Sequence, residues 1–275
     1  MKQNRKISSF APKNKSHPKA VNGKSNIQNI NLKKQRWVSG NHAVLEVLSV
    51  HPRSILKVIF QQGWQGLHLQ NEIYKKVKTL AIEVEEKPKG VLDKLFLNHQ
   101  GCLVLVEGRP KLLDSNLTAP SQLLFLDGIE DPHNLGAICR TSWLLGVQGI
   151  FIPEDRAVDI TPAVHKVACG GVEHVPISVE TQFKTSLEKF KEMGYWVFGL
   201  SHQAQNCIFE LEIPKKVIWC VGAEDKGLRG STEKLCDDFV SIPQVSSSAS
   251  YNASVAAGLV LSEGYRQHNY ASGRP

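Results

Sequence analysis

The sequence predicts an α/β protein with a mainly parallel sheet, preceded by a smaller α/β module and a basic arm. From residue 121 onward, short apolar runs alternate with stretches of helical length, which indicates buried parallel strands separated by helices. Residues 37–108 show a second, shorter alternation, and residues 109–120 between them read as a polar, proline-containing linker. A chain of 275 residues has room for both, at about 150 residues per domain.

The basic arm is expected over residues 1–36. The first 45 residues carry ten Lys or Arg and no Asp or Glu, and residues 1–36 lack apolar periodicity, so we expect them to be disordered. Lys and Arg near phosphates displace condensed counterions, which favours a polyanion as the partner of the arm. A solvated tail without a partner is the alternative. A transit peptide is less favoured because no amphipathic run is visible.

Regular elements are expected in both folded parts. In residues 37–108 the patterns predict helices over 41–48 and 69–78 and strands over 56–60 and 102–106. In residues 121–275 they predict strands over 123–126, 149–152, 175–177, 196–200, 217–221 and 239–242. The helices there are expected over 134–145, 161–168, 181–193, 231–235 and 252–267. The last helix has small or apolar residues at 253, 256, 257, 260, 261 and 264, a stripe suited to close packing in the core or in a dimer.

Composition and spacing exclude several classes of protein. No stretch approaches the roughly 18 consecutive apolar residues of a membrane span. The six cysteines form no CxxC pair and follow no signal peptide, so we expect reduced thiols in a cytoplasmic protein. No cysteine pair lies at metal-ligand spacing to a histidine, so no metal is expected.

The loop after the strand 123–126 is the first of three unusual loops at strand ends, where parallel sheets bind ligands. Asn134 is expected to be the N-cap of the following helix, and Gly136 allows close approach. Arg140 lies about one and a half turns further along. This arrangement would aim the polar groups of Asn134 and Arg140 at one spot, where a ligand could bind. The alternatives are that Asn134 only caps the helix and that Arg140 forms a surface ion pair.

The other two loops follow the strands 217–221 and 239–242. In the second loop, glycines at both ends of the acidic turn 222–228 let backbone groups face a ligand. It lacks the spacings of dinucleotide and nucleoside-triphosphate loops. The third loop, 242–254, is rich in serine and leads into the last helix, so it offers hydroxyls and amides to a ligand. An ordinary turn and a solvated linker are the respective alternatives.

Together and in this order, the loops resemble the three motifs of the SpoU (TrmH) family of RNA ribose 2′-O-methyltransferases. The resemblance covers residues 121–268, and its motifs are Asn134-Leu-Gly136…Arg140, Gly222-Ala-Glu224…Gly227-Leu228 and Ser250-Tyr-Asn252-Ala-Ser254. Residues 37–108, which contain Ser39-Gly40-Asn41-His42-Ala43-Val44, resemble that family's substrate-binding domain, which is similar to ribosomal protein L30e.

The resemblance implies a SPOUT-type domain with a deep trefoil knot that binds S-adenosyl-L-methionine in a bent conformation. The family's cofactor contacts, made chiefly by backbone groups, fall on Leu200, Gly222, Ile242 and Tyr251. Tyr251 stands where the family usually has leucine. The resemblance also implies a homodimer formed through the knot, in which Arg140 acts in a site shared with the partner.

The implied reaction is methyl transfer to the ribose 2′-hydroxyl of an rRNA nucleotide, a guanosine of 23S rRNA being the expected target. A guanidinium stays protonated in proteins, so we expect Arg140 to hold an RNA phosphate and stabilise the forming alkoxide. Asn134, Glu224, Ser250 and Asn252 would then orient the ribose and Arg140 by hydrogen bonds. The general base is not assigned.

Two other functions stay open at this point. One is 2′-O-methylation of tRNA, which a separate substrate domain disfavours only by analogy. The other is a catalytically silent protein that binds RNA or assists ribosome assembly. Four motif residues argue against a protein without catalytic activity: Asn134, Arg140, Glu224 and Asn252.

Overall fold

The computed structural model describes residues 35–270, with gaps at 98, 114–116, 156 and 247–248. The described residues belong to one compact unit. The predicted arm lies outside them except for residues 35 and 36, which begin the first strand. Among the described residues, no helix has the length and apolar character needed to cross a membrane.

The first part of the chain forms a four-stranded mixed sheet covered by helices. Its strands are β1 (Gln35–Ser39), β2 (Ile55–Gln61), β3 (Val84–Lys87) and β4 (Cys102–Glu107), in the order β1-β4-β2-β3. Only β3 runs parallel to its neighbour. The helices are α1 (Asn41–Val50), α2 (His68–Thr79) and α3 (Lys89–Leu95), with short 3₁₀ turns at Pro52–Ser54 and Trp64–Gly66.

The four elements predicted for residues 37–108 are confirmed, and three others were not anticipated. β1, β3 and α3 are short, and their apolar patterns are weak. β1 exists because all five of its residues pair with β4, which lies more than 60 residues further along the chain. Local patterns cannot report pairing over that separation.

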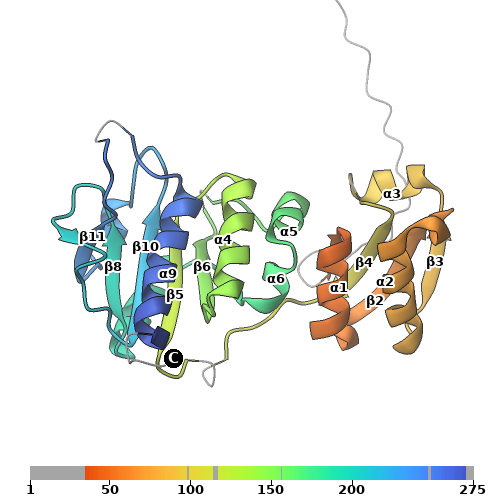
Figure 1. The fold of residues 1–275 in the computed structure, drawn as a ribbon, viewed down its shortest axis with the longest axis horizontal. Helices are drawn as coiled ribbons and strands as arrows, with labels where there is room; N and C mark the ends of the chain where they lie inside the picture. The colour runs from red at the N-terminus through yellow and green to blue at the C-terminus, as the bar shows by residue number, and fades with distance from the viewer. Residues whose placement is uncertain (1–34, 98, 114–116, 156, 247–248, 271–275) are drawn as a thin grey trace, which may run out of the picture. The chain divides into compact units, whose positions relative to one another are not determined.

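The second part of the chain contains a seven-stranded sheet in which every described pairing is parallel, so the prediction of a mainly parallel sheet is confirmed (Figure 1). The strand order is β7-β6-β5-β10-β8-β11-β9. The strands are β5 (Ser121–Asp127), β6 (Gly149–Pro153), β7 (Ile177–Glu180), β8 (Trp196–Leu200), β9 (Asn206–Cys207), β10 (Lys216–Gly222) and β11 (Asp238–Ser241). The helices are α4 (Pro132–Leu144), α5 (Pro162–Ala168), α6 (Gly171–His174), α7 (Phe183–Glu192), α8 (Gly230–Glu233) and α9 (Ala253–Tyr270).

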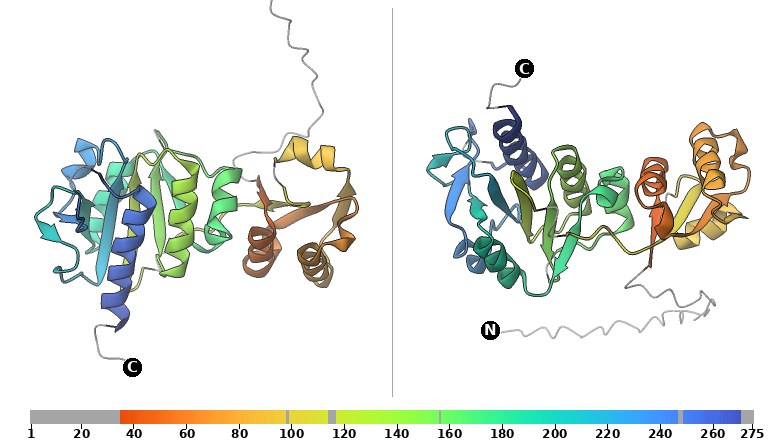
Figure 2. Two further views of the ribbon diagram at one scale, coloured as in Figure 1. Left: turned by 45° about the horizontal axis from the view of Figure 1, so that its top comes forward. Right: turned by 90° about the horizontal axis from the view of Figure 1, so that it is seen from below.

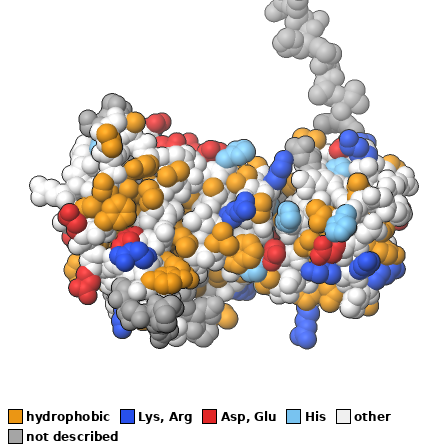
Figure 3. All heavy atoms as spheres, viewed as in Figure 1, with side chains coloured by type: hydrophobic (Ala, Val, Ile, Leu, Met, Phe, Trp, Pro, Cys, Tyr) orange, Lys and Arg blue, Asp and Glu red, His pale blue; other side chains and the backbone are white. Residues whose placement is uncertain are grey.

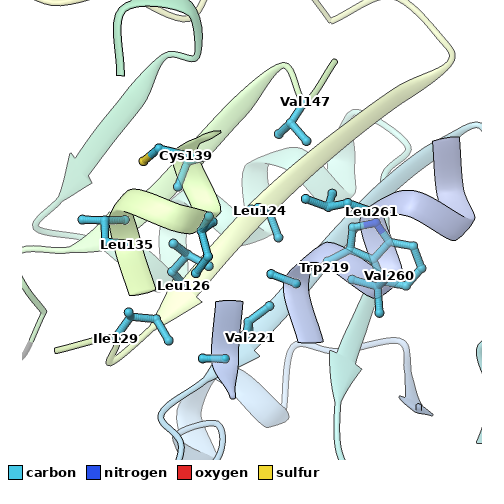
Figure 4. Close-up of a cluster of buried hydrophobic side chains, with 14 of the residues drawn as sticks. Leu124, Leu126, Ile129, Leu135, Cys139, Val147, Trp219, Val221, Val260 and Leu261 are labelled. Atoms are coloured by element: carbon cyan, nitrogen blue, oxygen red, sulfur yellow. The ribbon is translucent and has the colours of Figure 1, made fainter. Parts of the chain in front are cut away.

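Helices cover both faces of this sheet, as the edge-on view in Figure 2 shows. All seven residues of β5 are buried, and their side chains alternate between two cores. Leu124 and Leu126 join the core under α4 and α9, which Figure 4 shows in close-up. Leu123 and Phe125 join the core that includes α7. The central strands are therefore fixed from both sides, so the loops at their ends start from rigid positions.

The stripe on the last helix packs against the sheet, so of the two roles that the sequence leaves open the structure shows core packing. Ala257, Val260 and Leu261 are buried in the same core as Trp219. Gly264 allows α9 to approach β5, because a Cβ there would lie 2.1 Å from Gln122 Oε1. The same oxygen accepts a hydrogen bond from Trp219 Nε1 at 3.0 Å, so a buried polar contact fixes the depth of α9 on the sheet.

The N-cap of α4 differs from the predicted one. Asp131 caps this helix: its Oδ1 accepts a hydrogen bond from the His133 N–H at 2.9 Å, and Pro132 occupies the first helical position. The prediction that Asn134 is the N-cap is therefore wrong. Asn134 lies in the first turn instead, and its side chain is available for contacts outside the helix.

Candidate active site

A cavity of about 340 Å³ opens at the carboxyl ends of β8, β10 and β11. Its size is within the range of small-molecule sites, about 300 to 1,000 Å³. The four residues expected to contact a cofactor, Leu200, Gly222, Ile242 and Tyr251, all line it. The loops that follow β8, β10 and β11 thus surround one space, whereas the loop after β5, which carries the first motif, does not line it.

The turn after β10 forms one wall of the cavity, and its glycines are required by its shape. The Ala223 N–H donates to Gly227 O at 3.1 Å, and the Gly227 N–H donates to Ala223 O at 2.8 Å, so the chain turns back on itself. A Cβ on Gly222 would lie 2.1 Å from the backbone carbon of Gly227. Gly227 has a φ of +65°, which favours glycine.

Beside the cavity, the side chains of Asn134, Glu224 and Asn252 form one hydrogen-bonded group, which we call the amide–carboxylate cluster. Glu224 Oε1 accepts from Asn134 Nδ2 at 2.9 Å and from Asn252 Nδ2 at 2.5 Å. It also accepts from the Ala253 N–H at 3.1 Å, and Asn252 Nδ2 donates in addition to Asn134 Oδ1 at 2.9 Å. The cluster therefore joins one residue from each predicted motif around a single carboxylate oxygen.

Asn252 has a second role at the start of α9. Its Oδ1 accepts from the backbone N–H of Ser254 at 2.9 Å and from the Ser254 hydroxyl at 2.6 Å. Its backbone carbonyl accepts from the Ala256 N–H at 2.9 Å, so Asn252 caps the helix. The cap fixes the orientation of the Asn252 amide, so that its NH₂ group faces Asn134 and Glu224.

The serine-rich loop closes on itself beside the cavity, which Ser250 and Tyr251 both line. The Tyr251 hydroxyl donates to Pro243 O at 3.0 Å, and Gln244 Nε2 donates to Ala249 O at 2.9 Å. These bonds tie the two ends of the loop together. The Tyr251 side chain is thereby held at the wall of the cavity.

Arg140 lies apart from the amide–carboxylate cluster in the single chain. It follows Asn134 by six residues on α4, about 9 Å along the helix axis. Its side chain is exposed and does not line the cavity. One guanidinium nitrogen lies 3.7 Å from Cys169 Sγ. The structure thus brings together the other predicted site residues but leaves Arg140 on a neighbouring surface.

Several residues that line or support the site were not predicted. His202, Gln203 and Glu233 line the cavity. Asp127, at the end of β5, is buried and forms an ion pair with Arg229, whose backbone N–H also donates to it at 3.0 Å. This pair anchors the chain directly after the 222–228 turn. The signal in the sequence is a charged residue directly after the apolar run 123–126.

A ligand cavity at the carboxyl edge of a parallel sheet, with a polar cluster beside it that joins three separate parts of the chain, is typical of an α/β enzyme. The family model described as the SpoU rRNA Methylase family matches residues 121–262. The model described as RNA 2′-O ribose methyltransferase substrate binding matches residues 37–111. The chain belongs to the SpoU family of RNA 2′-O-ribose methyltransferases.

Individual proteins that are similar to this chain also belong to RNA methyltransferase families by name. The protein named 23S rRNA (guanosine-2′-O-)-methyltransferase RlmB from Nitrosomonas europaea is 34% identical over 86% of this chain and 94% of its own length. The protein of the same name from Shewanella oneidensis is 35% identical over 86% and 99%. The fold is similar to that of the SpoU methyltransferase AviRb from Streptomyces viridochromogenes, solved in complex with AdoMet. That similarity has a TM-score of 0.72 at 20% identity and covers 88% of this chain and 93% of the other.

Proposed function

We propose that this chain transfers the methyl group of S-adenosylmethionine to the ribose 2′-hydroxyl of a guanosine in 23S rRNA. The observation that carries this proposal is the amide–carboxylate cluster, which joins the three motif loops at the edge of the cavity. The relatives named 23S rRNA (guanosine-2′-O-)-methyltransferase support the choice of RNA and nucleotide.

In this proposal the cofactor lies in the cavity and supplies an electrophilic methyl group on a positively charged sulfur. Leu200, Gly222 and Ile242 hold it chiefly through backbone groups, and the Tyr251 ring packs against it. The residues fit this role because the glycine turn brings backbone, without side chains, to the wall of the cavity. The volume of about 340 Å³ suits a ligand of this size.

The amide–carboxylate cluster and Ser250 orient the ribose in this proposal. Alignment of a hydroxyl with a fixed methyl group contributes much of the rate in such a displacement. The cluster is preorganised, since Glu224 Oε1 already accepts three hydrogen bonds and Asn252 is fixed as a helix cap. Arg140 holds an RNA phosphate and stabilises the developing negative charge on the ribose oxygen.

The position of Arg140 supports a dimeric enzyme, in which the arginine of one protomer completes the site of its partner. Figure 3 shows hydrophobic side chains gathered on the face that carries α4 and α9. Leu144 of α4 is 66% exposed and Val255 of α9 is 48% exposed. Exposed apolar patches of this kind mark protein interfaces. We place the homodimer contact there, and light scattering on the purified protein would measure its mass.

A methyl-transfer assay tests the proposed substrate. Purified protein is incubated with tritiated S-adenosylmethionine and, separately, unmodified 23S rRNA, 16S rRNA and bulk tRNA. We expect label in 23S rRNA only. Arg140→Ala should bind S-adenosylmethionine normally by calorimetry but transfer little label. Label in tRNA alone would assign the chain to tRNA methylation, and no label in any RNA would favour a silent RNA-binding protein. We also propose that the protein acts in the cytoplasm, a reducing compartment that suits its six free cysteines.

A further inference from the structure

Glu173, on the short helix α6, is a buried carboxylate outside the cavity. It is bound by Arg36 of β1, the first strand of the four-stranded sheet, directly before the residues matched by the substrate-binding model. Its side chain has no exposed surface, and that of Arg36 is 9% exposed. Arg36 donates from both terminal nitrogens, at 2.7 Å to Glu173 Oε1 and 2.5 Å to Oε2. A two-point contact of this kind fixes orientation as well as distance.

A second arginine, Arg109, and the buried His165 also lie within electrostatic range of this ion pair. His165 Nδ1 lies 3.5 Å from Glu173 Oε1. Burial, followed by the charges of Arg36 and Arg109, lowers the pKa of His165 to about 3, so this histidine is neutral at neutral pH. Arg36 Nε donates to Gly108 O at 2.8 Å. One guanidinium therefore ties α6 to β1 and to the residue that follows β4.

A second contact joins α6 to the substrate-binding domain. His174 Nε2 lies 2.7 Å from Glu46 Oε2, on α1. The His174 ring stacks on Trp143 of α4, with ring centroids 4.0 Å apart. The stem of Glu46 lies directly over Gly170, where a Cβ would come within 2.4 Å of it. α6 thus contacts the substrate-binding domain on one side and α4 on the other, as its place in Figure 1 indicates.

The contact between α6 and α4 is made at the backbone of the proposed catalytic arginine. A Cβ on Gly171 would lie 2.7 Å from the Cys139 carbonyl oxygen and 2.9 Å from the Arg140 Cα. A shift of α6 toward α4 would therefore displace Arg140. The cofactor cavity is lined by other parts of the chain, none of them on α6.

We propose that Glu173 is a positioning residue, through which the substrate-binding domain sets the position of Arg140. The inference rests on the proposed role of Arg140 in methyl transfer. The ion pair with Arg36 seats the substrate-binding domain on α6, and α6 supports the Arg140 backbone. RNA bound by the substrate-binding domain is thereby delivered in a fixed relation to the catalytic helix, while cofactor binding does not depend on Glu173.

The test compares Glu173→Gln with a matched control, Glu85→Gln. Glu85 forms an ion pair with Lys57 at 2.5 Å within the first sheet, away from α6. For Glu173→Gln we expect an unchanged dissociation constant for S-adenosylmethionine and a rate at saturating 23S rRNA that is lower by about tenfold to a hundredfold, the effect of a displacement near 1 Å. Hydrogen exchange should increase in peptides covering 136–144. Glu85→Gln should match the wild type in all three measurements.

A double-mutant cycle separates positioning from general destabilisation. If Glu173 acts through Arg140, adding Glu173→Gln to Arg140→Ala should lower the single-turnover rate no further. Additive losses, or an unchanged rate in Glu173→Gln, would overturn the proposal. If Glu173→Gln does not fold, Arg36→Gln replaces it with the same expected results. A wild-type protein that methylates no RNA would refute the proposed function instead, so the two failures are distinguishable.

Discussion

Replacing Gly222 with alanine tests whether the turn after β10 forms the cofactor site. The added Cβ would lie 2.1 to 2.4 Å from backbone atoms of Gly227 and Leu228. An ordinary contact is about 3.5 Å or more, so the turn must move by more than about 1 Å. Overpacking of this size costs about 1 to 3 kcal/mol. At about 2 to 4 °C per kcal/mol, a cost near 2 kcal/mol lowers Tm by about 4 to 8 °C.

The same movement displaces a wall of the cavity. We therefore expect weaker binding of S-adenosylmethionine in addition to the lower Tm. A loss of about 1.4 kcal/mol is tenfold in affinity, and we expect the dissociation constant for S-adenosylmethionine to rise by at least about tenfold in calorimetry. Gly230→Ala is the matched control, since its Cβ would meet no atom within 4 Å. If Gly222→Ala binds the cofactor as tightly as Gly230→Ala does, this assignment of the cavity is refuted.

Three further predictions concern methyl transfer, the free energy of unfolding and its dependence on pH. Asn252→Ala removes the cap of α9 and two bonds of the amide–carboxylate cluster, so methyl transfer should fall at least about a hundredfold and urea denaturation should show a loss of about 1 to 2 kcal/mol; wild-type activity would contradict this. Gly264→Ala forces a Cβ against Gln122, and the free energy of unfolding should fall by about 1 to 3 kcal/mol while S-adenosylmethionine still binds. Burial raises the pKa of Cys102 and that of Cys139, the latter from 9.0 to about 12. Because the unfolded chain loses these protons first, stability should decrease as pH rises from 8 to 10, by about 1.4 to 2 kcal/mol per thiol at pH 10; a flat profile would contradict this.

Much of the fold could be predicted from local patterns, because a buried strand or an amphipathic helix has a pattern of apolar residues that is visible within the element itself. β5 and β10 are buried along most of their length, and the stripe of α9 packs as its spacing indicates. The pairing of β1 with β4 and the order of the seven strands could not be predicted from periodicity, since they depend on contacts between distant segments.

Part of the candidate site could also be predicted from the sequence. The second and third motif loops line one cavity, because the carboxyl ends of β10 and β11 lie at one edge of the sheet. Asn134 of the first motif joins them through the amide–carboxylate cluster. The sequence did not reveal that Asp131 rather than Asn134 caps α4. It also gave no sign of the buried Glu173 pair, since a charged residue in a four-residue helix usually faces solvent.

The most direct test of the central claim is nucleoside analysis of 23S rRNA after reaction with S-adenosylmethionine that carries a trideuterated methyl group. The account predicts that mass spectrometry finds the heavy methyl as 2′-O-methylguanosine, in an amount that Arg140→Ala greatly reduces. A heavy methyl on a base, or equal labelling by the Arg140→Ala variant, would contradict it.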